Sequence, residues 1–521
     1  MEILQIWSWV FLAIYVMVML ILGHLGMRRV KGADDFATAR GSYGAFFLAL
    51  AFTSTVASGA TFLGIPGLAY SYGLPVLWYI VGYPMAVYLG VWLCHKLVGS
   101  SGMRLGSRSI PEYLGDRFQS PGLRIIAAFF TLILLVYLAG QMVAGIVMFE
   151  MMLGLSSSWA LGITTIVLFI YLVLGGAHAD LLTDGIQGFL MLLLALAITI
   201  LFLLGVGADG AVGEVIKRLR EQDIEMVAAL HRSNSMFGSA WAVVAIFVAH
   251  IPLGLMPHVA NKLWALKDEQ SRNRFILLAL IFGIVLPAIG LGGLLARAVL
   301  GDVFIGQDGA ANAALPALFI ELMPAWLAAL LGIGILAAVM STADGLVIAT
   351  SQVFANDLYR RSYAPRWHSD LDEQAVDRNA LVISRWTTLV AMFLAATIAW
   401  ISLDRNIALL TWIAIGGMTA ALAGPMILGA VWRGVTRQGA LWGFICGAGT
   451  FIVAHTGVVS ADWFTGTFLL GPSEWFVKQA PNPFACATIA DVVSVSVTFI
   501  VSKVSQPLPE QHVISIFETS D

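Results

Sequence analysis

The stretch FTSTVASGATFLGIPGLAYSYG, residues 52–73, interrupts an apolar run that is long enough to cross a lipid bilayer. Small and polar residues recur through it, and it contains Pro66 and four glycines. Proline removes a backbone donor, and the carbonyls that it frees need partners where water is absent. The stretch therefore predicts either a kinked helix or a helix broken into two halves whose open carbonyls bind a cation or a substrate.

A second apolar stretch, WAVVAIFVAHIPLGLMPH at 241–258, is interrupted in the same way by Pro252, Gly254 and Pro257. The two stretches are the second and the seventh apolar spans of the chain, five spans apart. An inverted repeat of five helices makes them equivalent. Paired interrupted helices in two such repeats point to a transporter binding site, and we therefore favour broken helices over kinked ones.

The composition is that of a membrane protein. Of the 521 residues, 59% are hydrophobic and 11% are charged, and the mean hydropathy is +0.87, whereas soluble domains are about 25% charged. We expect an all-α polytopic membrane protein with about thirteen transmembrane helices: 6–26, 44–71, 74–98, 124–154, 158–176, 181–206, 238–257, 275–300, 325–356, 381–402, 406–431, 438–457 and 485–503.

We expect residues 1–521 to form a single membrane transport domain. Residues 44–206 form the first five-helix repeat in this prediction, and 238–431 form the second, inverted one. The accessory helices are 6–26, 438–457 and 485–503, followed by a short cytoplasmic tail over 504–521.

The basic residues predict the orientation. The first apolar segment has no basic residues before it, so it is interpreted as a retained span and not as a cleaved signal peptide. With the N-terminus outside and the C-terminus cytoplasmic, the inner loops and the tail carry 18 of the 28 Lys and Arg, and the outer loops carry six. We expect a multi-pass protein of the cytoplasmic membrane.

Other classes of function find no support. The net charge of −3 and the absence of a basic domain argue against nucleic acid as a partner. Cys94, Cys446 and Cys486 lie far apart and form neither a zinc motif nor a disulfide framework. An intramembrane hydrolase with Ser341 as nucleophile and His250 or His258 as base lacks the glycine-flanked nucleophile turn. We expect no enzyme and no cofactor.

The span at 325–356 carries polar residues in ILAAVMSTADGLVIATSQV, 335–353. Ala338, Ser341, Asp344 and Gly345 share one helix face, and Thr342 lies beside Ser341. The Ala338 carbonyl and the two hydroxyls form half of a hard-cation site, unless the hydroxyls only bond back to their own helix. A buried acid usually faces a partner or a cavity; Asp344 is a candidate to hold sodium, to carry a proton, or to pair with a cation such as Arg385.

A second acid lies in GGAHADLLTDGIQGFLML, 175–192. We expect Asp180 in a short inner turn, and Thr183 and Asp184 at the start of the next helix. Acids cap helix N-termini and complement the helix dipole. A capping role and a functional role for Asp184 are compatible, and both remain open.

Several of these stretches resemble landmarks of the sodium:solute symporter family, in the right order: ASGATFLGIPGLAY, GGAHADLLTDGIQGF, MPHVANKLWALKDEQ and GILAAVMSTADGLVIATSQVFANDLY. The resemblance covers residues 6–503. It implies thirteen helices, the leucine-transporter fold with two inverted five-helix repeats, and sodium-coupled uptake.

The resemblance also implies a sodium site. Its ligands are the carbonyls of Ser54, Ala57 and Ala338 and the hydroxyls of Ser341 and Thr342. Asp184 matches an acid of functional importance in the family. Some members bind a second sodium near that acid, using hydroxyls just beyond the serine–threonine pair. This chain has Asp344 and Gly345 there, so a carboxylate replaces the hydroxyls.

The resemblance bears on the solute as well. Members that carry proline have an acid in the second span and aromatic residues in the seventh, where this chain has Val56, Ala249 and Leu253. The sequence is closer to the pantothenate-type and monocarboxylate-type branches, which favours a carboxylate. The candidate solute-binding residues, each of which also has an ordinary packing role open to it, are Thr61, Tyr83, Tyr137, Gln141 and His250.

These observations predict a secondary transporter that carries sodium and a small organic solute by alternating access. Its partners are sodium, the solute and the lipid bilayer. One alternative is a proton-coupled symporter of the same fold, with Asp344 or His250 as the proton carrier. Another is a solute sensor that signals through a separate partner.

Overall fold

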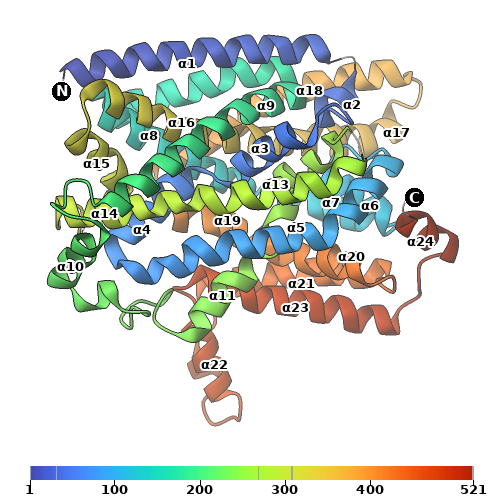
Figure 1. Ribbon diagram of the computed structural model, residues 1–521. Coiled ribbons are helices and arrows are strands. Elements are labelled where there is room, and N and C mark those ends of the chain that lie inside the picture. The colour runs from blue at the N-terminus through green and yellow to red at the C-terminus, as the bar shows by residue number, and fades with distance from the viewer. Residues whose placement is uncertain (1, 31, 268, 307–308, 519–521) are drawn as a thin grey trace.

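The computed structural model describes residues 2–30, 32–267, 269–306 and 309–518. Their regular secondary structure is helical, apart from one isolated bridge between Tyr43 and Leu266. The long helices lie side by side, and α1 (Glu2–Arg29) begins at the end of the bundle opposite to α24 (Glu510–Phe517) (Figure 1). The all-helical architecture agrees with the predicted class.

Ten helical segments of the described chain are long and apolar enough to cross a membrane. They are Glu2–Arg29, Leu74–Leu105, Pro121–Leu153, Gly176–Leu204, Arg272–Leu300, Ala325–Trp367, Glu373–Trp400, Ile407–Val431, Arg437–Thr456 and Pro483–Val504. Two further pairs cross only if each bent pair is one span, which brings the number to twelve. These pairs are the two stretches that the sequence predicts to be broken.

The remaining predicted span, 158–176, lies in the first part of α9. This element runs over Ser157–Leu204 and contains two predicted spans, which meet at a kink at Gly176. Gly176 changes the direction of the chain with φ 53° and ψ −147°, a conformation that glycine adopts at little cost. The inner turn expected at Asp180 is therefore wrong: Asp180 lies within the helix, and its side chain is buried.

The helices named below have the following bounds: α2 (Ala33–Thr38), α3 (Ala45–Val56), η1 (Ala60–Gly64), α4 (Ile65–Tyr72), α5 (Leu77–Leu105), α6 (Ile110–Arg117), α7 (Pro121–Thr131), α8 (Leu134–Leu153), α10 (Val212–Gln222), α11 (Ala240–His250), η4 (Leu253–Leu255), α12 (Pro257–Ala260), η5 (Asn261–Ala265), α13 (Arg272–Val285), α14 (Leu291–Leu300), α15 (Ala314–Leu322), α16 (Ala325–Gln352), η9 (Val353–Tyr363), α17 (Ala364–Trp367), α18 (Glu373–Trp400), α19 (Ile407–Leu422), η10 (Ala423–Leu428), α20 (Gly429–Val431), α21 (Arg437–Thr456), α22 (Leu470–Val477) and α23 (Pro483–Val504).

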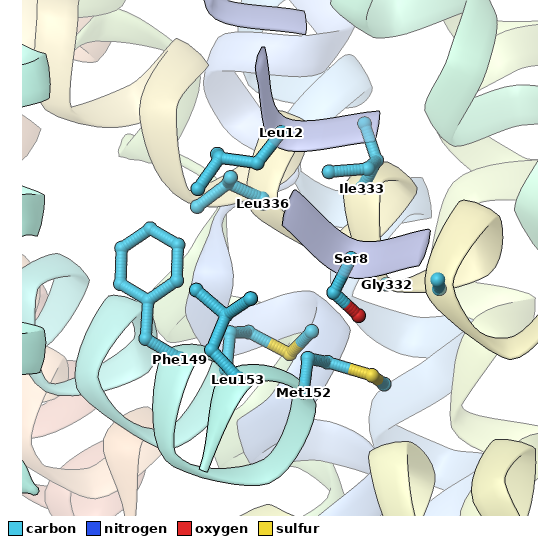
Figure 2. Close-up of a pocket in the computed structure, with 10 residues that line it drawn as sticks. Ser8, Leu12, Phe149, Met152, Leu153, Gly332, Ile333 and Leu336 are labelled. Atoms are coloured by element: carbon cyan, nitrogen blue, oxygen red, sulfur yellow. The ribbon is translucent and has the colours of Figure 1, made fainter. Parts of the chain in front are cut away.

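The first helix packs along α9, α16 and α8. A small apolar crevice of about 20 Å³ lies between α1, α8 and α16, and its walls include Leu12, Phe149, Met152 and Leu336 (Figure 2). Ser8 contributes the one side-chain hydroxyl among its lining residues. An apolar gap of this kind offers nothing to orient a polar solute, so it is not the candidate functional site.

The end of the predicted tail is a packed helix. In α24, Ile516 is buried, and its carbonyl accepts a hydrogen bond from Arg104 Nη2 of α5 (2.8 Å). The Phe517 ring lies between two guanidinium groups, 4.8 Å from that of Arg117 and 5.1 Å from that of Arg433. These contacts hold the tail against the ends of α5 and α6.

Candidate functional site

The second span is broken at its centre. Helix α3 ends at Val56, Ala57 is non-helical with φ −88° and ψ 86°, and the chain resumes through η1 and α4 at an angle of 61°. Pro66 does not cause the break, because it lies nine residues beyond Ala57, within the continuous half-helix Ala60–Tyr72. The matching pair, from α11 to η5, bends by 51°, with Pro257 opening α12.

The break frees carbonyls, and each of them has a partner from another helix. A helix end leaves its last carbonyls without intrahelical donors. Ser54 O accepts from Ser341 Oγ (2.9 Å), and Thr55 O accepts from Thr342 Oγ1 (3.0 Å). Val56 O accepts from Tyr83 Oη on α5 (3.1 Å). The hydroxyl pair of α16 therefore faces the open end of α3.

Four of the five predicted sodium ligands lie together here. Ser341 Oγ is also 3.3 Å from Ala338 O, so Ser54, Ala338 and Ser341 share one set of contacts with Thr342 beside them. Ala57 belongs to the same break, but Thr342 contacts the carbonyl of Thr55, one of the residues that the sequence prediction omits. These oxygen atoms are all buried, and oxygen donors suit a hard cation such as sodium.

The start of the second half-helix is capped from within the protein. Gly59 N–H donates to Gln141 Oε1 on α8 (2.9 Å), and Ala60 N–H donates to Ser58 Oγ (3.2 Å). Gln141 is fully buried, and its Nε2 has no hydrogen-bond partner among the described residues. A buried amide donor in this position is available to an acceptor group of a ligand.

A buried charged cluster lies next to the hydroxyl pair. One carboxylate oxygen from each of Asp180, Asp184 and Asp344 lies within 4.8 Å of the other two. Lys262 Nζ on η5 forms ion pairs with Asp180 Oδ2 (2.7 Å) and with Asp184 Oδ2. Two of the three carboxylates thus share one ammonium group. Because buried charge is costly unless it is neutralised, two carboxylates on one ammonium group favour the uptake of a further proton or cation.

Two adjacent residues connect this charged cluster with the hydroxyl pair. The carbonyl of Thr55 accepts a hydrogen bond from Thr342, and its hydroxyl donates one to Asp184 Oδ2 (2.7 Å). The carbonyl of Ser54 accepts a hydrogen bond from Ser341, and its hydroxyl donates one to Asp184 O (3.1 Å). The last turn of α3 therefore links the charged cluster to the hydroxyl pair, so a change in one affects the other.

A small crevice of about 10 Å³, the space of about one water molecule, borders the charged cluster. Its lining includes Asp180, Lys262 and Gly345, together with Ala37 and Thr38 of α2. Helix α2 thus lies beside the acids.

The predicted solute-binding residues surround the same break. Tyr83 contacts Val56, Gln141 contacts Gly59, and Thr61 lies in η1. The His250 ring, at the end of α11, lies 5.1 Å from that of Tyr83, and its Nδ1–H donates to Ile246 O (2.5 Å). Tyr137 lies one turn from Gln141 on α8, and its ring is 5.5 Å from that of His258.

Aromatic side chains that the sequence prediction omits complete this wall. The Trp412 ring of α19 lies 4.5 Å from His250, and Trp412 Nε1 donates to Tyr79 Oη (2.9 Å). Phe484 at the start of α23 packs on Trp412 at 4.7 Å. The signal for Trp412 and Tyr79 in the sequence is weak, because buried aromatic residues are common in packed membrane helices.

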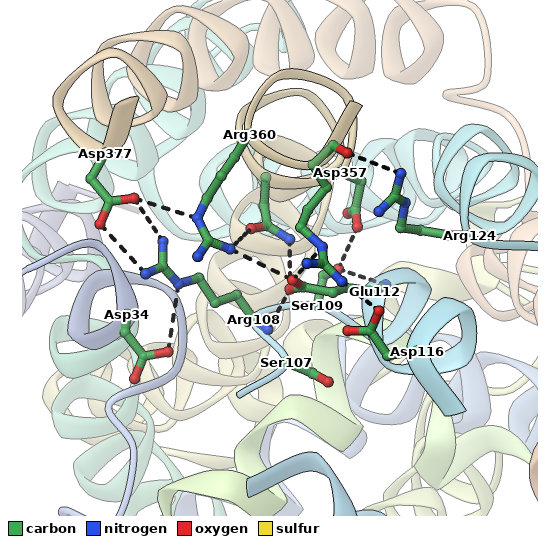
Figure 3. Close-up of polar contacts among 12 residues, drawn as sticks. Asp34, Ser107, Arg108, Ser109, Glu112, Asp116, Arg124, Asp357, Arg360 and Asp377 are labelled. Atoms are coloured by element: carbon green, nitrogen blue, oxygen red, sulfur yellow. Dashed lines mark hydrogen bonds and ion pairs between the residues drawn. The ribbon is translucent and has the colours of Figure 1, made fainter. Parts of the chain in front are cut away.

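A second polar network lies where α2, α6, η9 and α18 meet (Figure 3). Arg108 pairs with Asp377 of α18 (2.9 Å) and with Asp34 of α2 (3.6 Å). Glu112 pairs with Arg361 of η9 (2.9 Å), and Arg361 also contacts Asp116. Burial raises the pKa of Asp116, and the neighbouring Arg361 opposes that shift.

Comparisons with known proteins agree with this description. The family model described as "Sodium:solute symporter family" matches residues 36–447. A sodium/pantothenate symporter of Haemophilus influenzae is 28% identical over 444 residues, covering 82% of this chain and 86% of the relative. A sodium/proline symporter of Salmonella typhimurium is 28% identical over 463 residues, covering 84% and 86%. Since the two identities are equal, the predicted preference for one branch stays a prediction.

Two solved structures share the fold. A sodium-coupled sialic acid symporter in a substrate-bound outward-open state has a TM-score of 0.74 at 18% identity, covering 97% of this chain and 99% of that one. A nucleobase-cation-symport-1 family transporter, in a closed conformation with bromovinylhydantoin bound, has a TM-score of 0.53 at 14% identity, covering 94% and 98%. These likenesses confirm the predicted leucine-transporter fold.

The family match covers most of the chain, and the relatives are symporters and not enzymes. The function is therefore sodium-coupled transport of a solute across a membrane that the chain crosses many times. The chain belongs to the sodium:solute symporter family.

Proposed function

We propose that sodium binds between the open end of α3 and the hydroxyl pair of α16. Its ligands are the carbonyls of Ser54, Ala57 and Ala338 and the hydroxyls of Ser341 and Thr342. The single observation that carries the proposal is that Ser341 and Thr342 donate to carbonyls that the helix break leaves open. A cation binds between the carbonyl and hydroxyl oxygens, which both present lone pairs to it, while each hydroxyl keeps its proton and turns it away from the carbonyl.

The same break couples sodium to the solute. The carbonyls of Ser54 and Thr55 face the hydroxyl pair, whereas Val56 O and Gly59 N–H face Tyr83 and Gln141. A cation that fixes the open end of α3 therefore also fixes the residues next to the solute. Binding of one ligand lowers the conformational cost of binding the other, which is positive coupling by linkage.

The solute in this proposal is a small organic carboxylate. Gln141 Nε2 supplies a buried donor without a protein partner, and Tyr137, Tyr83, Thr61 and His250 line the same region. The aromatic rings around His250 bind the apolar part of the solute. Pantothenate, which one relative is named for, is itself a carboxylate.

The buried acids give this transport its second cation. A membrane potential of 100 mV is worth about 2.3 kcal/mol per charge, and a tenfold sodium gradient adds about 1.4 kcal/mol. An anion that moves with one sodium carries no net charge and gains only the chemical part. In our proposal a further sodium or proton bound at Asp184 and Asp344 restores the electrical part.

We place the N-terminus outside and the C-terminus in the cytoplasm of the cell that carries this protein in its cytoplasmic membrane. The distribution of Lys and Arg supports this orientation. In it, α2, α6 and α24 lie at the cytoplasmic end, and the small crevice beside α2 borders Asp180 and Lys262.

The experiment is a screen of radiolabelled solutes in proteoliposomes with an imposed sodium gradient or a choline control. We expect sodium-dependent uptake of a small carboxylate, which is lost in Gln141→Leu and partly kept in Gln141→Asn. Uptake that is confined to cationic or zwitterionic solutes would remove the carboxylate proposal and leave sodium coupling intact. Uptake that follows pH and ignores sodium would instead favour the proton-coupled alternative.

A further inference from the structure

The segment between α21 and α23 has an unusual composition. Residues 463–477, WFTGTFLLGPSEWFV, contain five aromatic residues and one charged residue, Glu474. The loop at 207–237 lies at the same end of the bundle, because Asn482 Nδ2 contacts Ser235 O (2.9 Å), and it carries nine charged residues. Two loops at the same end of the protein therefore differ sharply in polarity: one is rich in charged residues and the other in aromatic residues.

The 463–477 segment also lies outside the packed bundle. Helix α22 projects sideways from α23, across the direction in which the long helices run (Figure 1). Its aromatic side chains are open to the surroundings: Phe468 is 89% exposed, Trp463 68% and Trp475 47%. Because the long helices cross the bilayer, a sideways projection lies along the plane of the membrane.

The base of the segment is fixed to the protein. Trp241, in the first turn of α11, donates from Nε1 to Gln479 Oε1 (2.9 Å), and its ring lies 5.5 Å from that of Trp475. A rigid base and an exposed apolar tip are what a surface anchor needs. Tryptophan is enriched at the boundary between lipid tails and water, where its apolar ring and its N–H are both accommodated.

We propose that the 463–477 segment is a lipid-binding foot that inserts Trp463, Phe468 and Trp475 into the interfacial region of the bilayer. The lipid is favoured over a protein partner because residues 465–470, TGTFLL, have no charge for a partner to complement. Insertion into the bilayer removes the apolar surface of these rings from water, which is favourable. Through Trp241, the foot holds the outer half of the broken helix at a fixed depth.

The test places an environment-sensitive fluorophore at Phe468→Cys in protein reconstituted in phosphatidylcholine–phosphatidylglycerol vesicles. The wild type, with its native Cys94, Cys446 and Cys486, controls for background labelling. We expect blue-shifted emission that spin-labelled lipids quench and aqueous iodide does not. The matched control is Asp209→Cys, in the charged loop at the same end, which should behave in the opposite way.

Iodide quenching at position 468 equal to that at position 209, without quenching by lipid, would overturn the proposal. So would efficient disulfide cross-linking between two copies of the Phe468→Cys variant, because it would show that a second copy of this chain covers the segment. Sodium-dependent uptake by the labelled variant shows that the fold is intact, since Phe468 lies outside the proposed binding sites.

Discussion

Two charged regions of this transporter differ in how their acids are paired with bases. At the meeting point of α2, α6, η9 and α18, the carboxylates of Asp34, Glu112, Asp116 and Asp377 each pair with an arginine (Figure 3). The second region contains the buried carboxylates of Asp180, Asp184 and Asp344, and the first two of them share Lys262. In the first region each of these acids pairs with an arginine, whereas in the second two acids share a single ammonium group.

The difference separates a mechanical role from a binding role. Balanced and partly exposed ion pairs hold segments together without a need for ligands, and each contributes little. A buried cluster with too few cations is completed by a proton or a metal ion. The two regions meet at α2: Asp34 belongs to the balanced network, while Ala37 and Thr38 line the crevice beside Asp180. The network thus holds the helix that lies beside the acids.

The largest expected effect is a loss of stability when Lys262, the cation that Asp180 and Asp184 share, is removed. Lys262→Met leaves Asp180 and Asp184 without their partner, and loss of one member of a buried pair costs about 3–5 kcal/mol. We expect a clear fall in the midpoint of thermal unfolding in detergent, with partial recovery in Lys262→Met/Asp180→Asn. If the single variant unfolds at the same midpoint as the wild type, Asp180 and Asp184 do not depend on the charge of Lys262.

A smaller effect, on coupling more than on stability, is expected for Asp344→Asn. The change keeps the shape of the side chain and removes one carboxylate from the cluster, so the demand for a second cation falls. The reversal potential of solute transport in proteoliposomes should then shift toward fewer cations per solute, or uptake should lose its dependence on pH. Identical coupling in the variant and the wild type would rule out a role for Asp344 as the second cation site.

The smallest effect on stability is expected in the balanced network. Arg108→Ala removes pairs with Asp377 and Asp34 that are partly exposed, at a cost of about 1 kcal/mol or less. It should nevertheless increase the labelling of Thr38→Cys by a membrane-impermeant maleimide, because α2 is held less firmly. Lys217→Ala, which breaks the exposed pair with Glu214, is the control. Equal labelling with and without Arg108 would show that the network does not hold α2 in place.

The sequence predicts the parts of the site that local patterns control. Glycine and proline in two matched spans indicate the breaks, and helical spacing brings Ala338, Ser341 and Thr342 to one side of α16. Lys262 could not be predicted in this way, because it is one of several basic residues in its stretch and meets an acid 78 positions away. Asp180 is misplaced because the chain turns at Gly176, four residues earlier, so Asp180 already lies in the helix that follows.

Contacts between distant segments explain the other omissions. In the sequence, Thr55 is one of several hydroxyl residues in a polar stretch, and nothing local distinguishes it. Its partner Asp184 comes from the packing of α3 against α9. The pair of Arg108 and Asp377 joins residues that are 269 positions apart. No short-range pattern in the sequence specifies such pairs.

The proposed sodium site is tested most directly by the sodium dependence of solute uptake in Ser341→Ala and Thr342→Ala. Thr350→Ala is a matched control, because Thr350 is a buried residue of the same helix whose hydroxyl bonds back to Leu346 O of its own helix (2.8 Å). We predict that each site variant loses sodium affinity by about tenfold or more, the equivalent of about 1.4 kcal/mol, while Thr350→Ala keeps it. Sodium affinities of all three variants that match the wild type would contradict the assignment of sodium to this site.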